Sequence, residues 1–98
     1  MTVRRMGPWM YPVDERVLEH LNEESWASPS TMASDSRFQQ LGVDEGYIRQ
    51  RCEQLVNREL IAPIVEDSDM YEITSMGIAY LDGNCDARYL PNWSVRYG

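Results

Sequence analysis

One helical segment constrains the fold of this chain more than any other feature. Asp44 is a helix-capping residue, and the apolar residues from Ile48 to Val56 recur at helical spacing. The pattern predicts an amphipathic helix from Glu45 to about Glu59. An apolar, β-branched run follows this helix at once.

Two short strands are predicted directly after this helix. The run 60–65 is apolar, and the segment 70–74 alternates between apolar and polar residues. Four turn-forming residues, 66–69, join the two segments. Pro63 marks the first segment as an edge strand or a strand entry. We therefore expect a β-hairpin.

Three other helices complete the predicted order of elements. Helix-start signals and glycine stops place them at residues 14–24, 28–40 and 75–82. The order is then helix, helix, helix, strand, strand, helix, which is mainly α with a small β-hairpin (α+β). This order predicts a winged helix-turn-helix domain. We assign residues 1–11 to an N-terminal arm, 12–83 to the domain and 84–98 to a mostly irregular C-terminal arm.

The sequence shows none of the residue sets expected of an enzyme, a metal site or a membrane protein. His20 is the only histidine, and neither cysteine has metal-ligand spacing. No nucleophile–base set and no phosphate-binding glycine loop is present. No apolar run approaches the roughly 20 residues that cross a bilayer, and no secretion signal is seen. We expect a cytoplasmic protein without a cofactor, with Cys52 as a buried apolar residue; Cys85 has no assigned role.

The charge balance argues against nucleic acid as a partner. The chain has 98 residues, of which 16 are acidic and nine are basic, all nine of them arginine, for a formal net charge of −7. Such a protein is repelled by the phosphate backbone in dilute buffer. The net charge describes only the whole chain, so the positions of the arginines along the sequence also bear on whether the protein binds nucleic acid.

Short motifs spread over residues 9–91 resemble one known family. The matching motifs are Trp9-Met10, Asp14-Glu15-Arg16, Ser28-Pro29, Met32-Ala33, Tyr47-Ile48, Arg51-Cys52-Glu53, Tyr71-Glu72-Ile73-Thr74, Gly77, Tyr80-Leu81, Gly83 and Asp86-Ala87. Together with the lysine-free, acidic composition, they resemble the small haloarchaeal winged-helix proteins similar to the phage phi-H repressor. This resemblance implies a transcriptional regulator, either a phage immunity repressor or a chromosomal relative.

A haloarchaeal origin would also account for the acidic charge. In molar salt the Debye length is about 3 Å, so repulsion between the protein and DNA is screened. Counterion release gives little help under the same conditions. Affinity would then come from base contacts, shape fit and dimer avidity.

The helix at 45–59 carries the predicted DNA-binding residues. Its polar side, opposite the apolar stripe, suits base edges in a major groove, and its flanks suit phosphates. The predicted base-facing residues are Gly46, Tyr47, Gln50 and Glu53. The predicted phosphate contacts are Arg49, Arg51 and Arg58, with Ser28, Ser30, Thr31 and Arg37 from the preceding helix.

Several of these assignments have a second interpretation. Gln50 is also an ordinary solvated helix residue, and Tyr47 equally suits the core. Arg51 and Arg58 are also placed to pair with acids along the helix. The wing turn, 66–69, carries three acids and no arginine, which argues against a minor-groove contact by the wing.

The two arms are rich in aromatic residues. Packing against the chain's own domain is one explanation, and a homodimer interface is the other. We expect a homodimer because two-fold symmetry doubles the DNA site that one winged helix reads. The residues concerned are Trp9, Tyr11, Tyr89, Trp93 and Tyr97.

Two functions follow from the sequence. The first is a DNA-binding transcriptional regulator, a repressor by resemblance, that acts on duplex DNA as a homodimer. The alternative is an acidic winged-helix module for protein interaction or dimerisation that does not bind DNA. The arginine-edged helix favours the first, and the acidic wing favours the second.

Overall fold

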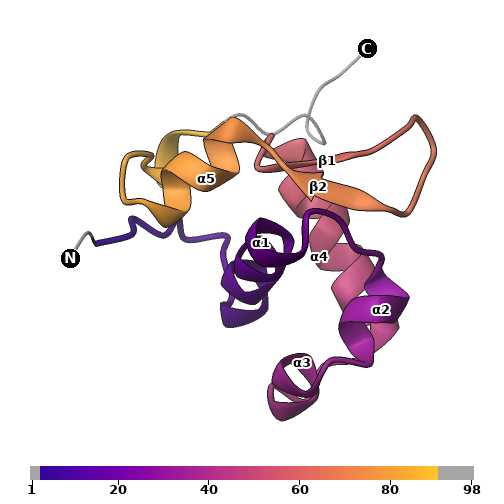
Figure 1. Cartoon of the computed structure of the whole chain (residues 1–98). Helices are drawn as coiled ribbons and strands as arrows, with labels where there is room; N and C mark the ends of the chain where they lie inside the picture. The colour runs from indigo at the N-terminus through magenta and orange to yellow at the C-terminus, as the bar shows by residue number, and fades with distance from the viewer. Residues whose placement is uncertain (1–2, 91–98) are drawn as a thin grey trace.

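The computed structural model describes residues 3–90, and within them the chain is mostly helical with one small hairpin. Figure 1 shows α1 at the centre, with α4 and the hairpin on one side and α5 on the other. The elements are α1 (Pro12–Glu24), α2 (Pro29–Ala33), α3 (Ser36–Gln40), α4 (Glu45–Asn57), β1 (Ile61–Pro63), β2 (Tyr71–Ile73), α5 (Ser75–Leu81) and the 3-10 turn η1 (Ala87–Tyr89). This architecture confirms the predicted fold class.

The hairpin is antiparallel, with Ala62 paired to Glu72 at its centre. The strands are shorter than predicted, and the long loop between them forms the wing (Figure 1). Ala27, after α1, adds a further pairing to the free edge of β2, since its N–H and C=O both bond to Tyr71. The sheet is thus tied to the end of α1 as well as to α4.

The second predicted helix, 28–40, is in fact two helices, and this part of the prediction is wrong. Ser28 caps α2 by accepting a hydrogen bond from the N–H of Thr31. Asp35 then caps α3 by accepting from the N–H of Arg37 at 2.8 Å. A side-chain cap in the middle of the segment starts a new helix because it replaces the backbone acceptor of the previous turn.

The predicted arms are packed onto the domain as far as the structure describes them. The N–H of Ala87 donates to the carbonyl of Arg5, and the indole Nε1 of Trp9 donates to the carbonyl of Ala87. Arg4 donates to the carbonyl of Leu81 at the end of α5. The segments before α1 and after α5 therefore bind each other.

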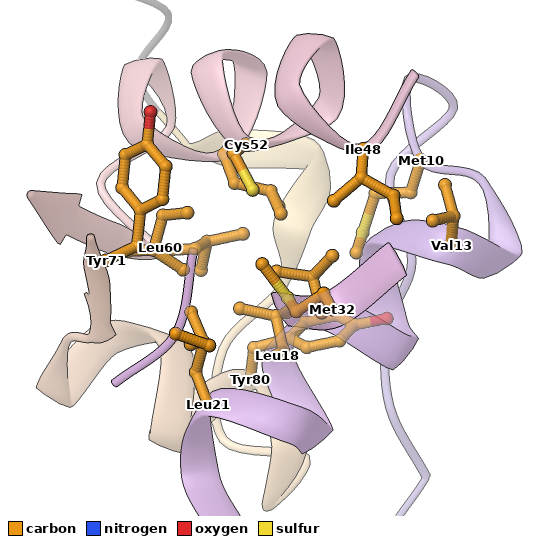
Figure 2. Close-up of a cluster of buried hydrophobic side chains, with 14 of the residues drawn as sticks. Met10, Val13, Leu18, Leu21, Met32, Ile48, Cys52, Leu60, Tyr71 and Tyr80 are labelled. Atoms are coloured by element: carbon orange, nitrogen blue, oxygen red, sulfur yellow. The ribbon is translucent and has the colours of Figure 1, made fainter. Parts of the chain in front are cut away.

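The core lies where α1, α2, α4, α5 and the hairpin meet. Figure 2 shows its side chains converging from these elements. Cys52 lies within this cluster, fully buried, and burial raises the pKa of its thiol to about 12. The predicted apolar role of Cys52 fits this environment, because a thiol that stays protonated is a small hydrophobe. Across the described residues, every helix is too short or too polar to cross a bilayer.

Gly77 marks the closest approach between α5 and the hairpin. A Cβ atom built there would overlap the carbonyl oxygen of Leu60 and lie 2.6 Å from Cγ1 of Ile73. The Leu60 carbonyl is held in place because it accepts from both the N–H and the hydroxyl of Thr74. Only glycine lets α5 start this close to the sheet.

We predict that Gly77→Ala lowers the free energy of unfolding by about 1–3 kcal/mol, the range for overpacking a filled site. The matched control is Gly46→Ala in α4, where the nearest atom to an added Cβ is 3.6 Å away. That change should stabilise the chain by about 0.5–1 kcal/mol through helix propensity. Urea unfolding of both variants measures the difference, and equal effects would contradict the packing argument.

His20 is a buried titratable group between α1 and α3. Its ring packs edge-on against Phe38, with ring centroids 5.6 Å apart. Its Nδ1 atom is buried without a hydrogen-bond partner among the described residues, and the nearest carboxylate oxygen, on Asp35, is 4.0 Å away. Burial lowers the pKa of His20, and the Asp35 charge only partly opposes this effect.

We predict that the free energy of unfolding falls as the pH drops below about 6.5. His20 has a lowered pKa in the folded chain, so the unfolded chain binds its proton more tightly. The contribution of His20 to the free energy of unfolding is therefore fully present above the pKa that His20 has in the unfolded chain. It decreases as the pH falls toward the pKa that His20 has in the folded chain. Urea unfolding at several pH values measures the slope, and His20→Gln should flatten it. An unchanged slope in that variant would assign the effect to other groups.

Candidate nucleic-acid interface

Helix α4 divides into a buried stripe and an exposed polar face. Ile48, Cys52 and Leu55 are fully buried, which follows from their helical spacing. Gly46, Gln50 and Glu53, three of the four predicted base-facing residues, are exposed. This face, together with the wing beside it, is the candidate interface.

Tyr47, the fourth predicted base-facing residue, is half-buried at the edge of this face. It lines a small apolar hollow of about 180 Å³ between the start of α1 and the start of α4. Tyr11, Val13 and Val43 form other parts of the hollow. The ring therefore supports the packing of α4 while its edge stays accessible.

Arg49 connects α4 to the wing. Its guanidinium donates to Glu45 one turn earlier at 3.0 Å and to Asp69 in the wing loop at 3.5 Å. The hydrogen bond to Glu45 raises the pKa of Arg49. A phosphate contact by Arg49 would have to replace these two partners. Breaking exposed ion pairs of this kind costs little free energy.

Arg51 is tied to the interior rather than to the exposed face. Its Nε and Nη2 atoms donate to the two carboxylate oxygens of Asp14, both at 2.8 Å, and Nη2 also donates to the carbonyl of Trp9. The Asp14 side chain is completely buried. Hydrogen bonding to Asp14 raises the pKa of Arg51. Both side chains have a partner within the chain, so Arg51 has a structural role on this flank.

Arg58 lies farther along the same flank, at the C-terminal end of α4. Its guanidinium stacks over the ring of Trp9 at 4.6 Å, as Arg51 does over Tyr11 at 4.8 Å. Burial, and then the charge of Arg51, lowers the pKa of Arg58. The segment before α1 therefore covers this edge of α4 with two aromatic rings.

The predicted contacts from the second helix lie near the start of α2 and on α3. Ser30 and Thr31 are exposed in the first turn of α2, whereas Ser28 is buried as its cap. Arg37, on α3, donates to Glu23 and to Asp35. Among the described residues, no hydrogen bond or ion pair joins these residues to the predicted arginines of α4.

The predicted aromatic interface is only partly described by the structure. Trp9 is half-buried against the core, Tyr11 is 52% exposed and Tyr89 is 79% exposed. Trp93 and Tyr97 lie outside the described residues. Tyr11 and Tyr89 are exposed even though Arg51 and Arg88 stack on their rings, whereas Trp9 packs within the domain.

A groove separates α4 from the wing. Its volume is about 250 Å³, and its walls include Glu53 and Asn57 from α4 and Asp67 and Tyr71 from the hairpin. Sequence reasoning missed this groove, because nothing in the pattern of residues showed how close the wing comes to α4. Among residues 3–90, no group of three or more His, Cys, Asp and Glu side chains is placed to hold a metal ion.

Comparison with known proteins identifies the family. A family model described as winged helix-turn-helix phage repressor matches residues 2–92. The chain belongs to this family. Among solved structures, it is similar to the PhiH1 repressor-like protein from Haloarcula marismortui, with a TM-score of 0.82 and 28% sequence identity over 94% of this chain and 99% of that one. A search of curated proteins gives no match. The resemblance predicted from the sequence is confirmed.

We predict that Arg51→Met lowers the free energy of unfolding by about 3–5 kcal/mol, because it leaves the buried carboxylate of Asp14 without its cation. Arg49→Met is the matched control, because it removes an exposed arginine from the same helix and should leave stability almost unchanged. Thermal and urea unfolding measure both variants. A small loss in Arg51→Met, equal to that of the control, would show that Asp14 finds another partner.

Proposed function

We propose that this winged-helix protein is a DNA-binding transcriptional regulator that reads duplex DNA with α4 in the major groove. The observation that carries the proposal is the exposed polar face of α4. Gln50 stands at the centre of that face, and its side chain has no hydrogen-bond partner among the described residues. A free glutamine amide can pair with N6 and N7 of adenine, and the neighbouring Glu53 can accept from N4 of cytosine.

The structure changes which residues we propose as phosphate contacts. Arg49 and Arg58 remain on the two edges of α4, with Ser30, Thr31 and Arg37 contributing from α2 and α3. Arg51 is left out because its guanidinium is occupied by Asp14. Ser28 contributes through its capping of α2.

We propose that the regulator acts as a repressor in the cytoplasm and in molar salt. The family to which the chain belongs is described as phage repressor, and a protein of Haloarcula marismortui shares its fold. Seven of the nine arginines have an acidic or aromatic partner within the described residues: Arg4, Arg16, Arg37, Arg49, Arg51, Arg58 and Arg88. Little positive charge is therefore left for phosphates. Screening by salt makes such a surface compatible with DNA.

We also propose a homodimer, in which exposed aromatic rings such as Tyr89 meet across the two-fold axis. Two copies would place two α4 helices on half-sites about one helical turn apart. The alternative function, a protein-interaction module, is favoured by one observation. Arg49, the basic residue nearest to Gln50 on the wing side, is already paired with two acids.

We predict that the protein binds a duplex from its own promoter region more tightly than a scrambled duplex in molar potassium chloride, with two chains per duplex. Gln50→Ala should reduce that preference roughly tenfold, because it removes one base contact. Arg49→Ala should weaken binding to both duplexes equally. Fluorescence anisotropy measures both effects.

The matched control for this experiment is Gln39→Ala, which removes an exposed glutamine from α3. It should bind both duplexes like the parent protein. The regulator is ruled out if the parent protein shows no preference between the duplexes. It is ruled out equally if Gln50→Ala and Gln39→Ala behave alike.

A further inference from the structure

The groove between α4 and the wing is lined by both polar and apolar residues. Glu53 and Asn57 form the α4 wall, and Asp67 forms part of the wing wall. Val56 and Pro63 supply apolar surface between them. A ligand in this groove would meet residues with carboxylates from both α4 and the wing, together with apolar side chains.

Tyr71 lines this groove from the side of the core. The residue is only 7% exposed. Figure 2 shows the ring beside the C-terminal turns of α4, with its hydroxyl directed away from the apolar cluster. No hydrogen-bond partner for this hydroxyl is present among residues 3–90, and burial raises the pKa of Tyr71, so the hydroxyl keeps its proton. The hydroxyl oxygen itself is not among the buried atoms that lack a partner, so it is accessible and can accept a hydrogen bond from a ligand or from water.

The charge of the groove is uncompensated. Neither Glu53 nor Asp67 forms an ion pair within the described residues, although both carboxylates line the groove. Arg49 of α4, which reaches the wing, is committed to Glu45 and Asp69. Carboxylates on both walls repel a phosphate and attract a cation.

We propose that this groove binds an arginine side chain from a basic segment of a protein partner. The aliphatic stem of arginine would lie along Val56 and Pro63, as such stems do on apolar surfaces. The planar guanidinium has five donors, which can reach both carboxylates and the oxygen of Tyr71 together. Lysine offers a compact charge with fewer fixed donors, so the groove should prefer arginine.

This binding does not depend on the proposed function. The peptide is bound without DNA, and Asp67 and Tyr71 are not among the proposed DNA contacts. If α4 also reads DNA, a partner in the groove would lie beside Gln50 and would compete with the duplex.

The test is a titration of the full chain with a short peptide of alternating glycine and arginine, followed by backbone amide shifts in NMR spectra at low salt. The control peptide carries citrulline, which has the shape of arginine without its charge. We expect the arginine peptide to shift the amides of Glu53, Asn57 and Asp67, and the citrulline peptide to bind at least tenfold more weakly.

Variants of the groove complete the test. Asp67→Asn and Tyr71→Phe should each weaken peptide binding about three- to tenfold. Asparagine suits position 67 because the backbone there has φ of 65°, which asparagine tolerates. The matched control is Glu66→Gln, which removes a neighbouring charge that does not line the groove.

Two results would overturn the proposal. One is equal weakening by Glu66→Gln and Asp67→Asn, which would indicate diffuse attraction to an acidic surface. The other is a set of shifts that the promoter duplex produces in the groove and the peptide does not, which would assign the groove to nucleic acid. If the parent protein binds the peptide but shows no preference for the promoter duplex, only the proposed function is rejected.

Discussion

The buried ion pair between Asp14 and Arg51 is the interaction on which the arrangement of α4 depends. Asp14 accepts two hydrogen bonds from Arg51 and a third from the N–H of Tyr11, so one carboxylate joins the start of α1, the preceding segment and α4. A buried carboxylate is tolerated only when its hydrogen bonds are this complete. The pair therefore fixes α4 against α1, and with it the direction in which the polar face of α4 points.

The position of α4 in turn decides how charge is distributed on the candidate interface. One edge of the helix is covered by Trp9 and Tyr11, which stack on Arg58 and Arg51. The other edge meets the acidic wing through Arg49 and Asp69. Between them the exposed surface is polar and acidic rather than basic. Such a surface suits contacts to base edges more than contacts to phosphates. It also offers an uncompensated acidic site to a cationic ligand in the groove.

Helical periodicity predicted the buried and exposed sides of α4, because burial follows spacing on one continuous helix. The hairpin was predicted for a similar reason, since its turn and its alternating strand are adjacent in sequence. The division of 28–40 into α2 and α3 was missed because Asp35, in a polar stretch, resembled an ordinary helix residue rather than a cap. The prediction for Arg51 considered partners along α4 and DNA phosphates, whereas its partner Asp14 lies 37 positions away in the sequence.

The sequence by itself determined the fold class, the family and the identity of the helix that carries the candidate interface. Each of these depends on local pattern: spacing, capping residues, turn residues and short motifs. Only the tertiary structure decided which arginines are available, where Trp9 packs and how the wing and α4 enclose a groove lined by Tyr71. These features depend on contacts between distant segments, and a side chain with several possible partners takes the one that burial and hydrogen bonding favour in the folded chain.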